Sequence, residues 1–234
     1  TEQIMIHKPV NVYYLQDQII AALSEEMDSN KGLLYLSGGT ALTRFHLDNT
    51  RFSEDLDFFY DVSVQNWHKW LSSLSKHGFH VQVLGALEET GKANTLSAIV
   101  SKNQSGIRVD FIEDFFSGMW LPQQIKTQYG GFFIDHIDAI RHKKFYIVES
   151  SLRQNMPLRG KDVFDLLCLC YNRWHEIVAY YKKYSELAGF DFYSIREAII
   201  KHTDFQDIYL INQKDFSTSR ITKKEINKWQ NSFQ

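Results

Sequence analysis

The sequence predicts an α+β protein in which a core with a small mixed sheet is followed by a mainly helical part. Short apolar runs, stopped by glycine or polar residues, fill much of the first 116 residues and are typical of strands. After about residue 134 the apolar residues recur at helical spacing instead. We therefore expect an α/β core over residues 1–133 and a helical region packed on that core over residues 134–234.

The first part alternates between helices and strands. Leu15, Ile19, Leu23 and Met27 share one helical face, and Gly78 ends a second amphipathic stretch. Helices are predicted over 13–29, 40–47 and 64–78. The apolar runs between them predict strands over 32–39, 55–61, 79–85, 94–102 and 106–116.

The second part contains only helical patterns. Apolar residues lie three and four positions apart along each of its segments, with lysine, arginine and glutamate between them. The predicted helices cover 135–152, 159–174, 176–189 and 222–233.

Composition excludes several classes of protein. The 234 residues carry a formal net charge of −2, which gives no sign of a nucleic-acid partner, although a local basic surface can still exist. The chain has two cysteines, Cys168 and Cys170, and residues two apart do not face each other on a helix, so we expect a reduced, cytoplasmic protein. No apolar run reaches the roughly 18 residues that span a membrane, and neither a P-loop motif nor a zinc-spaced His/Cys cluster occurs.

The stretch "SGGT", residues 37–40, joins a predicted strand to a predicted helix. Glycines let a phosphate approach the backbone, and the hydroxyls of Ser37 and Thr40 can add donors beside Gly38 and Gly39. An ordinary tight turn is the alternative reading, because Gly-Gly is first of all a turn signal.

Two aspartates follow at alternate positions of an apolar run. In a strand, Asp55 and Asp57 point to the same face, where their carboxylates repel each other unless a cation lies between them. Mg²⁺ is the natural cation because it prefers oxygen ligands and is shared between carboxylates and substrate phosphates. A solvated strand end is the alternative.

A third aspartate lies inside another apolar run. Asp110 stands between Val109 and Phe111, where a lone charge is unexpected. If its strand neighbours 55–61, the three acids can bind two metal ions, one activating the attacking oxygen and one steadying the leaving phosphate. The alternative is a local ion pair of Asp110 with Arg108.

Together these motifs resemble the DNA polymerase β-like nucleotidyltransferases, and among them the AbiEii/AbiGii family of type IV toxin–antitoxin and abortive-infection toxins. The family pattern G-G-T-A-L is matched by residues 38–42 and R-x-S-x-D-x-D by residues 51–57. A downstream lysine and a basic-D-x-x-D-L signature correspond to "RHKKFYIV" and "RGKDVFDLLCL". The resemblance covers residues 33 to 168 and implies a polymerase β-like core.

The resemblance also implies roles for individual residues. Asp55, Asp57 and Asp110 would ligate Mg²⁺, with Asp110 as a base for the acceptor hydroxyl. The nucleotide would be bound by Ser37, Gly38, Gly39, Thr40, Lys143 or Lys144, and Asp165.

Three of these assignments leave a choice open. Lys144 is preferred over Lys143 as the catalytic lysine. Asp162 or Asp165 would orient the lysine or the nucleotide, and the other acid could be structural, for example as a partner of Arg159. Arg51 is expected to fix its loop by pairing with an acid rather than to touch substrate.

The function implied is transfer of a nucleoside monophosphate from an NTP to an acceptor, with RNA, and tRNA in particular, as the leading acceptor. The family further implies a cognate antitoxin and growth arrest. A small-molecule nucleotidyltransferase of the antibiotic-modifying sort and a non-catalytic binding protein are the alternatives. The intact set of three acids and Gly-Gly-Thr argues against the last of these.

Overall fold

A computed structural model describes residues 9–128 and 130–170 of the chain. It divides into two compact units, and the first comprises residues 1–41 and 53–139. The second comprises residues 42–52 and 140–234. The short segment 42–52, which carries Arg51, therefore belongs with the C-terminal residues rather than with its neighbours in sequence.

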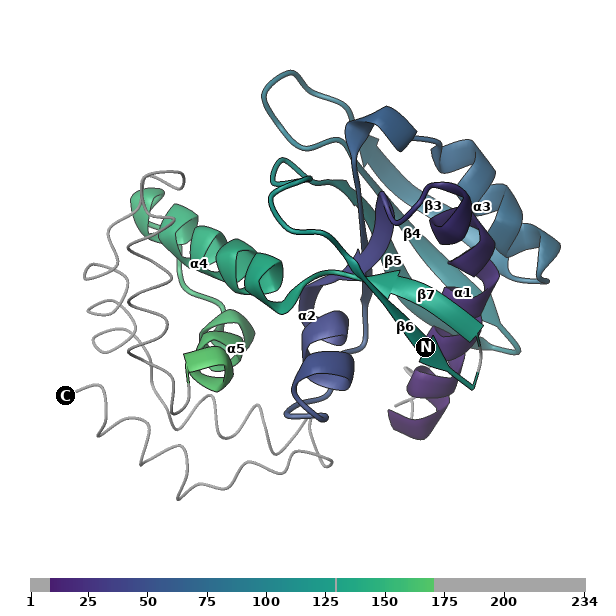
Figure 1. The fold of residues 1–234 in the computed structure, drawn as a ribbon, viewed down its shortest axis with the longest axis horizontal. Helices are drawn as coiled ribbons and strands as arrows, with labels where there is room; N and C mark the ends of the chain where they lie inside the picture. Colours follow the sequence, from purple (N-terminus) through teal and green to yellow (C-terminus); the bar gives the residue numbers. More distant parts are fainter. Residues whose placement is uncertain (1–8, 129, 171–234) are drawn as a thin grey trace, which may run out of the picture. The chain divides into compact units, whose positions relative to one another are not determined.

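The first unit is built on a seven-stranded sheet (Figure 1). The strands lie in the order β3-β4-β5-β2-β1-β7-β6. Their bounds are β1 Leu34–Ser37, β2 Leu56–Tyr60, β3 His80–Leu87, β4 Thr95–Lys102, β5 Ser105–Glu113, β6 Gln123–Thr127 and β7 Gly130–Ile134.

The sheet is mixed, as the sequence predicts. β2 pairs antiparallel with β1 and parallel with β5. β1 pairs parallel with β7, and the remaining neighbours β3–β4, β4–β5 and β6–β7 are antiparallel hairpins. The three strands that carry the sequence motifs, β1, β2 and β5, are thus direct neighbours in the middle of the sheet.

Two helices, α1 (Pro9–Ser29) and α3 (Trp67–Lys76), pack together against one face of the sheet (Figure 1). Trp70 of α3 stacks on Phe111 of β5 at 5.2 Å between ring centroids and meets Tyr60 of β2 edge-on at 5.1 Å. Phe58 stacks on Phe111 at 5.5 Å. The alternate side chains of β2 and β5 that point to these helices therefore form the core, and the intervening ones point to the opposite face.

The segment after β1 starts as an α-helix and continues as a π-helix. Gly38–Thr40 forms the short α-helical segment α2, and Ala41–His46 continues as the π-helix η1. A 3₁₀ turn, η2 (Val62–Val64), follows β2. The predicted helix over 40–47 is present in this modified form.

The described part of the second unit is helical. α4 (Ile137–Arg153) crosses the boundary between the units after Ala139, and α5 (Gly160–Cys170) follows it. Phe145, Val148, Phe164 and Leu166 are buried along these two helices.

The hairpin β6–β7 is the main element that the sequence did not predict. Its strands read "QQIKT" and "GGFFI", in which glutamine, lysine and glycine interrupt the alternation, and β6 lies at the sheet edge with polar residues exposed. The helices predicted over 176–189 and 222–233, and the end of the one over 159–174, lie outside the described residues.

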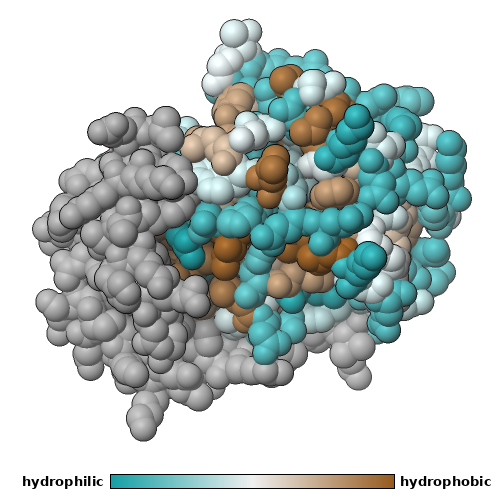
Figure 2. Space-filling view, in the orientation of Figure 1, coloured by the Kyte–Doolittle hydropathy of each residue, from teal (hydrophilic) through white to brown (hydrophobic). Residues whose placement is uncertain are grey.

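None of the helices in the described part of the chain is long and apolar enough to cross a membrane. In the face viewed in Figure 2, apolar residues form separate areas among hydrophilic ones.

Candidate active site

Asp57 and Asp110 lie directly opposite each other on neighbouring parallel strands. In the β2–β5 pairing, Asp57 is the register partner of Asp110. Leu56, Phe58 and Tyr60 of β2 are buried, so the alternating Asp57 points to the face that α1 and α3 leave open. Asp110 was expected to join the other two acids if its strand lay beside residues 55–61. β5 is indeed the neighbour of β2.

The same pairing brings Asp55 and Arg108 beside these two acids. Asp55 immediately precedes β2, two residues before Asp57, and Arg108 stands two residues before Asp110 on β5. Since residues two apart share a face, three carboxylates and one guanidinium gather on the open face of the sheet.

Arg108 is held by the third acid and by a serine of the next strand. Its Nε lies 3.0 Å from both carboxylate oxygens of Asp110, and it donates from a terminal nitrogen to Ser97 Oγ at 3.1 Å. The hydrogen bond and charge of Asp110 raise the pKa of Arg108, and Asp55 and Asp57 add to that shift. The guanidinium, half exposed to solvent, thus lies in the field of all three acids.

Gly38 makes room for the Asp57 carboxylate. Its φ is +68°, in the region that glycine adopts without strain. A Cβ atom at this position would overlap Asp57, with Asp57 Cγ 2.7 Å away. The backbone of the Gly-Gly turn therefore packs directly on one of the candidate metal ligands.

The two hydroxyls of "SGGT" are engaged inside the fold. Ser37 Oγ donates to Asp135 Oδ2 at 2.7 Å, and Thr40 Oγ1 donates to the Asp55 carbonyl oxygen at 2.5 Å. Both side chains are fully buried. These hydroxyls therefore hold the turn in place, whereas the sequence suggested that they donate to a phosphate. The backbone N–H groups of Gly38 and Gly39 are still predicted to donate to a phosphate.

Gln16 of α1 also contacts the site, although its sequence pattern does not predict this. Its side-chain amide donates to the carbonyl oxygens of Ser53 and Glu54 at 2.8 Å and 2.9 Å. The side chain is fully buried, and these carbonyls immediately precede Asp55. The only hint in the sequence was that Gln16 is a polar residue on the apolar face of a predicted helix, where a side chain needs a hydrogen-bond partner.

The donor set of the open face fits a hard divalent cation. Carboxylate oxygens on adjacent strands are the ligands that Mg²⁺ prefers, and the absence of a Cβ on Gly38 lets the Asp57 carboxylate lie directly against the backbone of the turn. Among residues 9–128 and 130–170, no three His, Cys, Asp or Glu side chains stand as a ready-made metal-binding group. In the arrangement described, Asp110 directs both of its oxygens to Arg108.

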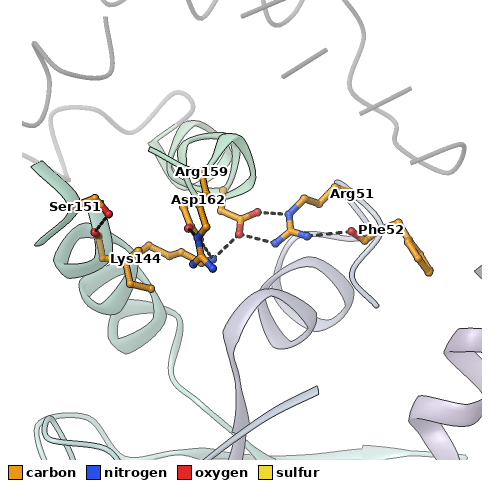
Figure 3. A network of polar contacts seen from close by, with 8 residues as sticks. Arg51, Phe52, Lys144, Ser151, Arg159 and Asp162 are labelled. Carbon is orange, nitrogen blue, oxygen red and sulfur yellow. Dashed lines mark hydrogen bonds and ion pairs between the residues drawn. The ribbon is translucent and has the colours of Figure 1, made fainter. Parts of the chain in front are cut away.

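The second unit contains a buried ion-pair network (Figure 3). Lys144 Nζ lies 2.8 Å from Asp162 Oδ1 and 2.8 Å from Asp165 Oδ2. Arg51 binds Asp165 through two nitrogens, at 2.6 Å and 2.7 Å, and Arg159 pairs with Asp162 at 2.6 Å. The expected pairing of Arg51 with an acid is therefore present, and Asp165 is the partner.

The charges of this network stabilise one another. Burial alone would lower the pKa of Lys144, but Asp165 and Asp162 outweigh it and raise that pKa. Burial would raise the pKa values of both aspartates, yet Lys144, Arg51 and Arg159 hold them below the ordinary value. Both acids therefore contact Lys144, and Asp162 is also the one that pairs with Arg159.

The predicted site residues thus fall in two groups. The first unit holds the turn Ser37–Thr40 and the acids Asp55, Asp57 and Asp110. The second unit holds Lys144 with Asp162 and Asp165, and also Lys143, which is buried on α4.

Comparison with protein-family models decides the family. Residues 22–141 match the model described as nucleotidyl transferase AbiEii toxin of the type IV toxin–antitoxin system. This stretch is just over half of the chain and includes the Gly-Gly turn and all three acids. The chain belongs to the AbiEii family. It is therefore a nucleotidyltransferase, as the motifs indicated.

Solved structures support the fold. JHP933 from Helicobacter pylori matches with a TM-score of 0.55 and 14% identity, over 96% of this chain and 89% of that one. A second H. pylori protein, described as a candidate nucleotidyltransferase, matches with a TM-score of 0.54 and 15% identity over 96% of this chain and 92% of its own. No curated protein sequence matches the chain.

Proposed function

We propose that this AbiEii-family protein transfers a nucleoside monophosphate from an NTP to RNA, with tRNA as the leading acceptor, and that it is the toxin of a type IV toxin–antitoxin pair. The observation that supports the transfer reaction is the register of Asp57 with Asp110, on the open face and two residues from Asp55. A cognate antitoxin is implied by the family alone.

Asp55, Asp57 and Asp110 are the residues that would hold Mg²⁺. When bound, the ion would neutralise the triphosphate and lower the pKa of an oxygen that attacks or leaves. Asp57 and Asp110, on neighbouring central strands, would supply ligands from adjacent positions of the same face. Asp110 is also placed to accept the proton of the acceptor hydroxyl once it is released from Arg108.

The Gly-Gly turn is proposed to hold the β- and γ-phosphates through its backbone N–H groups. The backbone of Gly38 lies against the Asp57 carboxylate, so a phosphate bound at this turn would lie beside that carboxylate and could share a cation with it. In the second unit, Lys144 is the proposed phosphate-binding lysine, and the acids Asp162 and Asp165 keep it charged.

The acceptor is identified by offering the enzyme several acceptors with one label. Purified protein, Mg²⁺ and each α-labelled NTP in turn are incubated with total cellular RNA, with and without later ribonuclease treatment, or with aminoglycosides. We expect label in a discrete, ribonuclease-sensitive band of tRNA size. Label that appears only in the aminoglycoside fraction would replace this function with small-molecule transfer, and NTP binding without transfer to any acceptor would indicate a binding protein.

A further inference from the structure

Gln16 joins α1 to the backbone that leads into the acidic strand. Its Nε2 donates to Ser53 O at 2.8 Å and to Glu54 O at 2.9 Å, so both amide hydrogens are used. The side chain is fully buried, and the bonds cross 37 and 38 positions of sequence. One side chain thus supplies hydrogen-bond partners to two consecutive backbone carbonyls, of which that of Ser53 belongs to a buried residue and therefore requires a partner within the fold.

A second side chain holds the next carbonyl. Thr40 Oγ1, from the turn after β1, donates to Asp55 O at 2.5 Å. Three consecutive carbonyls, of Ser53, Glu54 and Asp55, are thus each bound by a side chain from an earlier element. β2 begins at the following residue, so these bonds fix the backbone at the entrance of the strand that carries Asp57.

We propose that Gln16 is a positioning residue for the acidic site: by fixing the backbone of residues 53–55 it sets where the carboxylates of Asp55 and Asp57 lie. The inference rests on the proposed function, since it assigns Gln16 a role only if these acids bind the metal ion. A displacement of about 1 Å at a reacting group can lower the rate about 100-fold. The loss of the two Gln16 hydrogen bonds would therefore lower the rate of nucleotidyl transfer.

The test uses Gln16→Met in the whole 234-residue chain, because methionine keeps the length of the side chain but donates no hydrogen bond. Gln18→Met is the matched control on the same helix. Leu74→Ala, a fully buried core position of α3, controls for a general loss of stability. Mn²⁺ affinity by electron paramagnetic resonance and amide hydrogen exchange of residues 53–57 are measured at a temperature where every variant is folded.

We expect Gln16→Met to weaken Mn²⁺ binding about tenfold and to speed exchange at residues 53–57, with a fall in kcat that exceeds the change in KM for NTP. Gln18→Met and Leu74→Ala should leave Mn²⁺ affinity and exchange in this segment unchanged.

Two results would overturn the positioning role. Wild-type Mn²⁺ affinity in Gln16→Met, with binding lost in Asp57→Asn, would leave the metal site standing and make Gln16 a purely structural residue. Wild-type Mn²⁺ affinity in Asp57→Asn would reject the acidic metal site itself, and the role of Gln16 with it.

Discussion

The backbone of Gly38 is packed against the carboxylate of Asp57 so closely that no side chain fits between them. A Cβ on Gly38 would lie 2.8 Å from Asp57 Cβ and 2.7 Å from its Cγ. The positive φ of Gly38 adds a second reason for glycine. The position of the Asp57 carboxylate therefore requires a glycine at residue 38. This steric requirement links the Gly-Gly part of the motif to its aspartate part.

Gly38→Ala should impair the site more than the fold. The alanine would cost about 1–2 kcal/mol from its left-handed backbone, and its methyl group would push the Asp57 carboxylate aside. We expect transfer activity to fall by more than about tenfold, measured with labelled NTP, while the circular dichroism spectrum stays that of the wild type. Gly85→Ala is the control, since a Cβ there would meet nothing within 4 Å; equal activity of the two variants would argue against the steric coupling.

Arg108→Gln should increase the affinity for a divalent ion. The variant removes a positive charge that binds Asp110 and lies in the field of Asp55 and Asp57. Two charges about 4 Å apart in water interact with about 1 kcal/mol, so, because the guanidinium is half exposed and screened, we expect a gain of about fivefold at most. Titration with Mn²⁺ in the absence of nucleotide measures it.

Lys92→Gln removes the same charge from an exposed loop and should leave Mn²⁺ affinity as it is. A weaker affinity in Arg108→Gln would show that the arginine supports the metal site rather than competing with the ion.

Asp165→Ala should destabilise the second unit strongly. The substitution leaves Arg51 without its bidentate partner and Lys144 with one carboxylate instead of two. Removing one member of a buried ion pair costs about 3–5 kcal/mol. Urea denaturation followed by circular dichroism measures the loss, and a change below about 1 kcal/mol would mean that the network is not formed in solution.

The same network should make the protein sensitive to acid. The pKa values of Asp162 and Asp165 are lower in the folded state than in the unfolded chain, where an aspartate has a pKa of about 3.9. Their contribution to the free energy of unfolding is therefore fully present above about pH 4 and is lost as the pH falls through the lowered values. Urea midpoints at pH 7, 5, 4 and 3 should drop more steeply for the wild type than for Asp165→Asn.

Much of the site follows from local patterns in the sequence. The alternation of Asp57 with Leu56 and Phe58 indicates both a strand and an acid on its open face, and the same holds for Asp110 between Val109 and Phe111. Such alternation can be recognised in one sequence because all side chains on the same face of a strand share one environment, buried or open.

The remaining features depend on contacts between distant segments. Gln16 binds carbonyls 37 and 38 residues away, and such a bond leaves no periodic trace in either segment. Ser37 and Thr40 have the right chemistry for phosphate, but only the fold decides that Asp135 and the Asp55 carbonyl take their hydroxyl protons. The sequence predicted that Arg51 pairs with an acid, but only the structure identifies that acid as Asp165.

The central claim is that nucleotidyl transfer depends on the acids that β2 and β5 place in register. It is tested most directly by incorporation of label from α-labelled NTP into RNA by the wild type, Asp57→Asn, Asp110→Asn and the exposed-acid control Glu88→Gln. Since even outer partners of metal ligands are worth about 10- to 100-fold, we predict that each of the two strand variants loses more than about 100-fold and that the control retains full activity. Labelling by Asp57→Asn or Asp110→Asn at the wild-type rate would contradict the account.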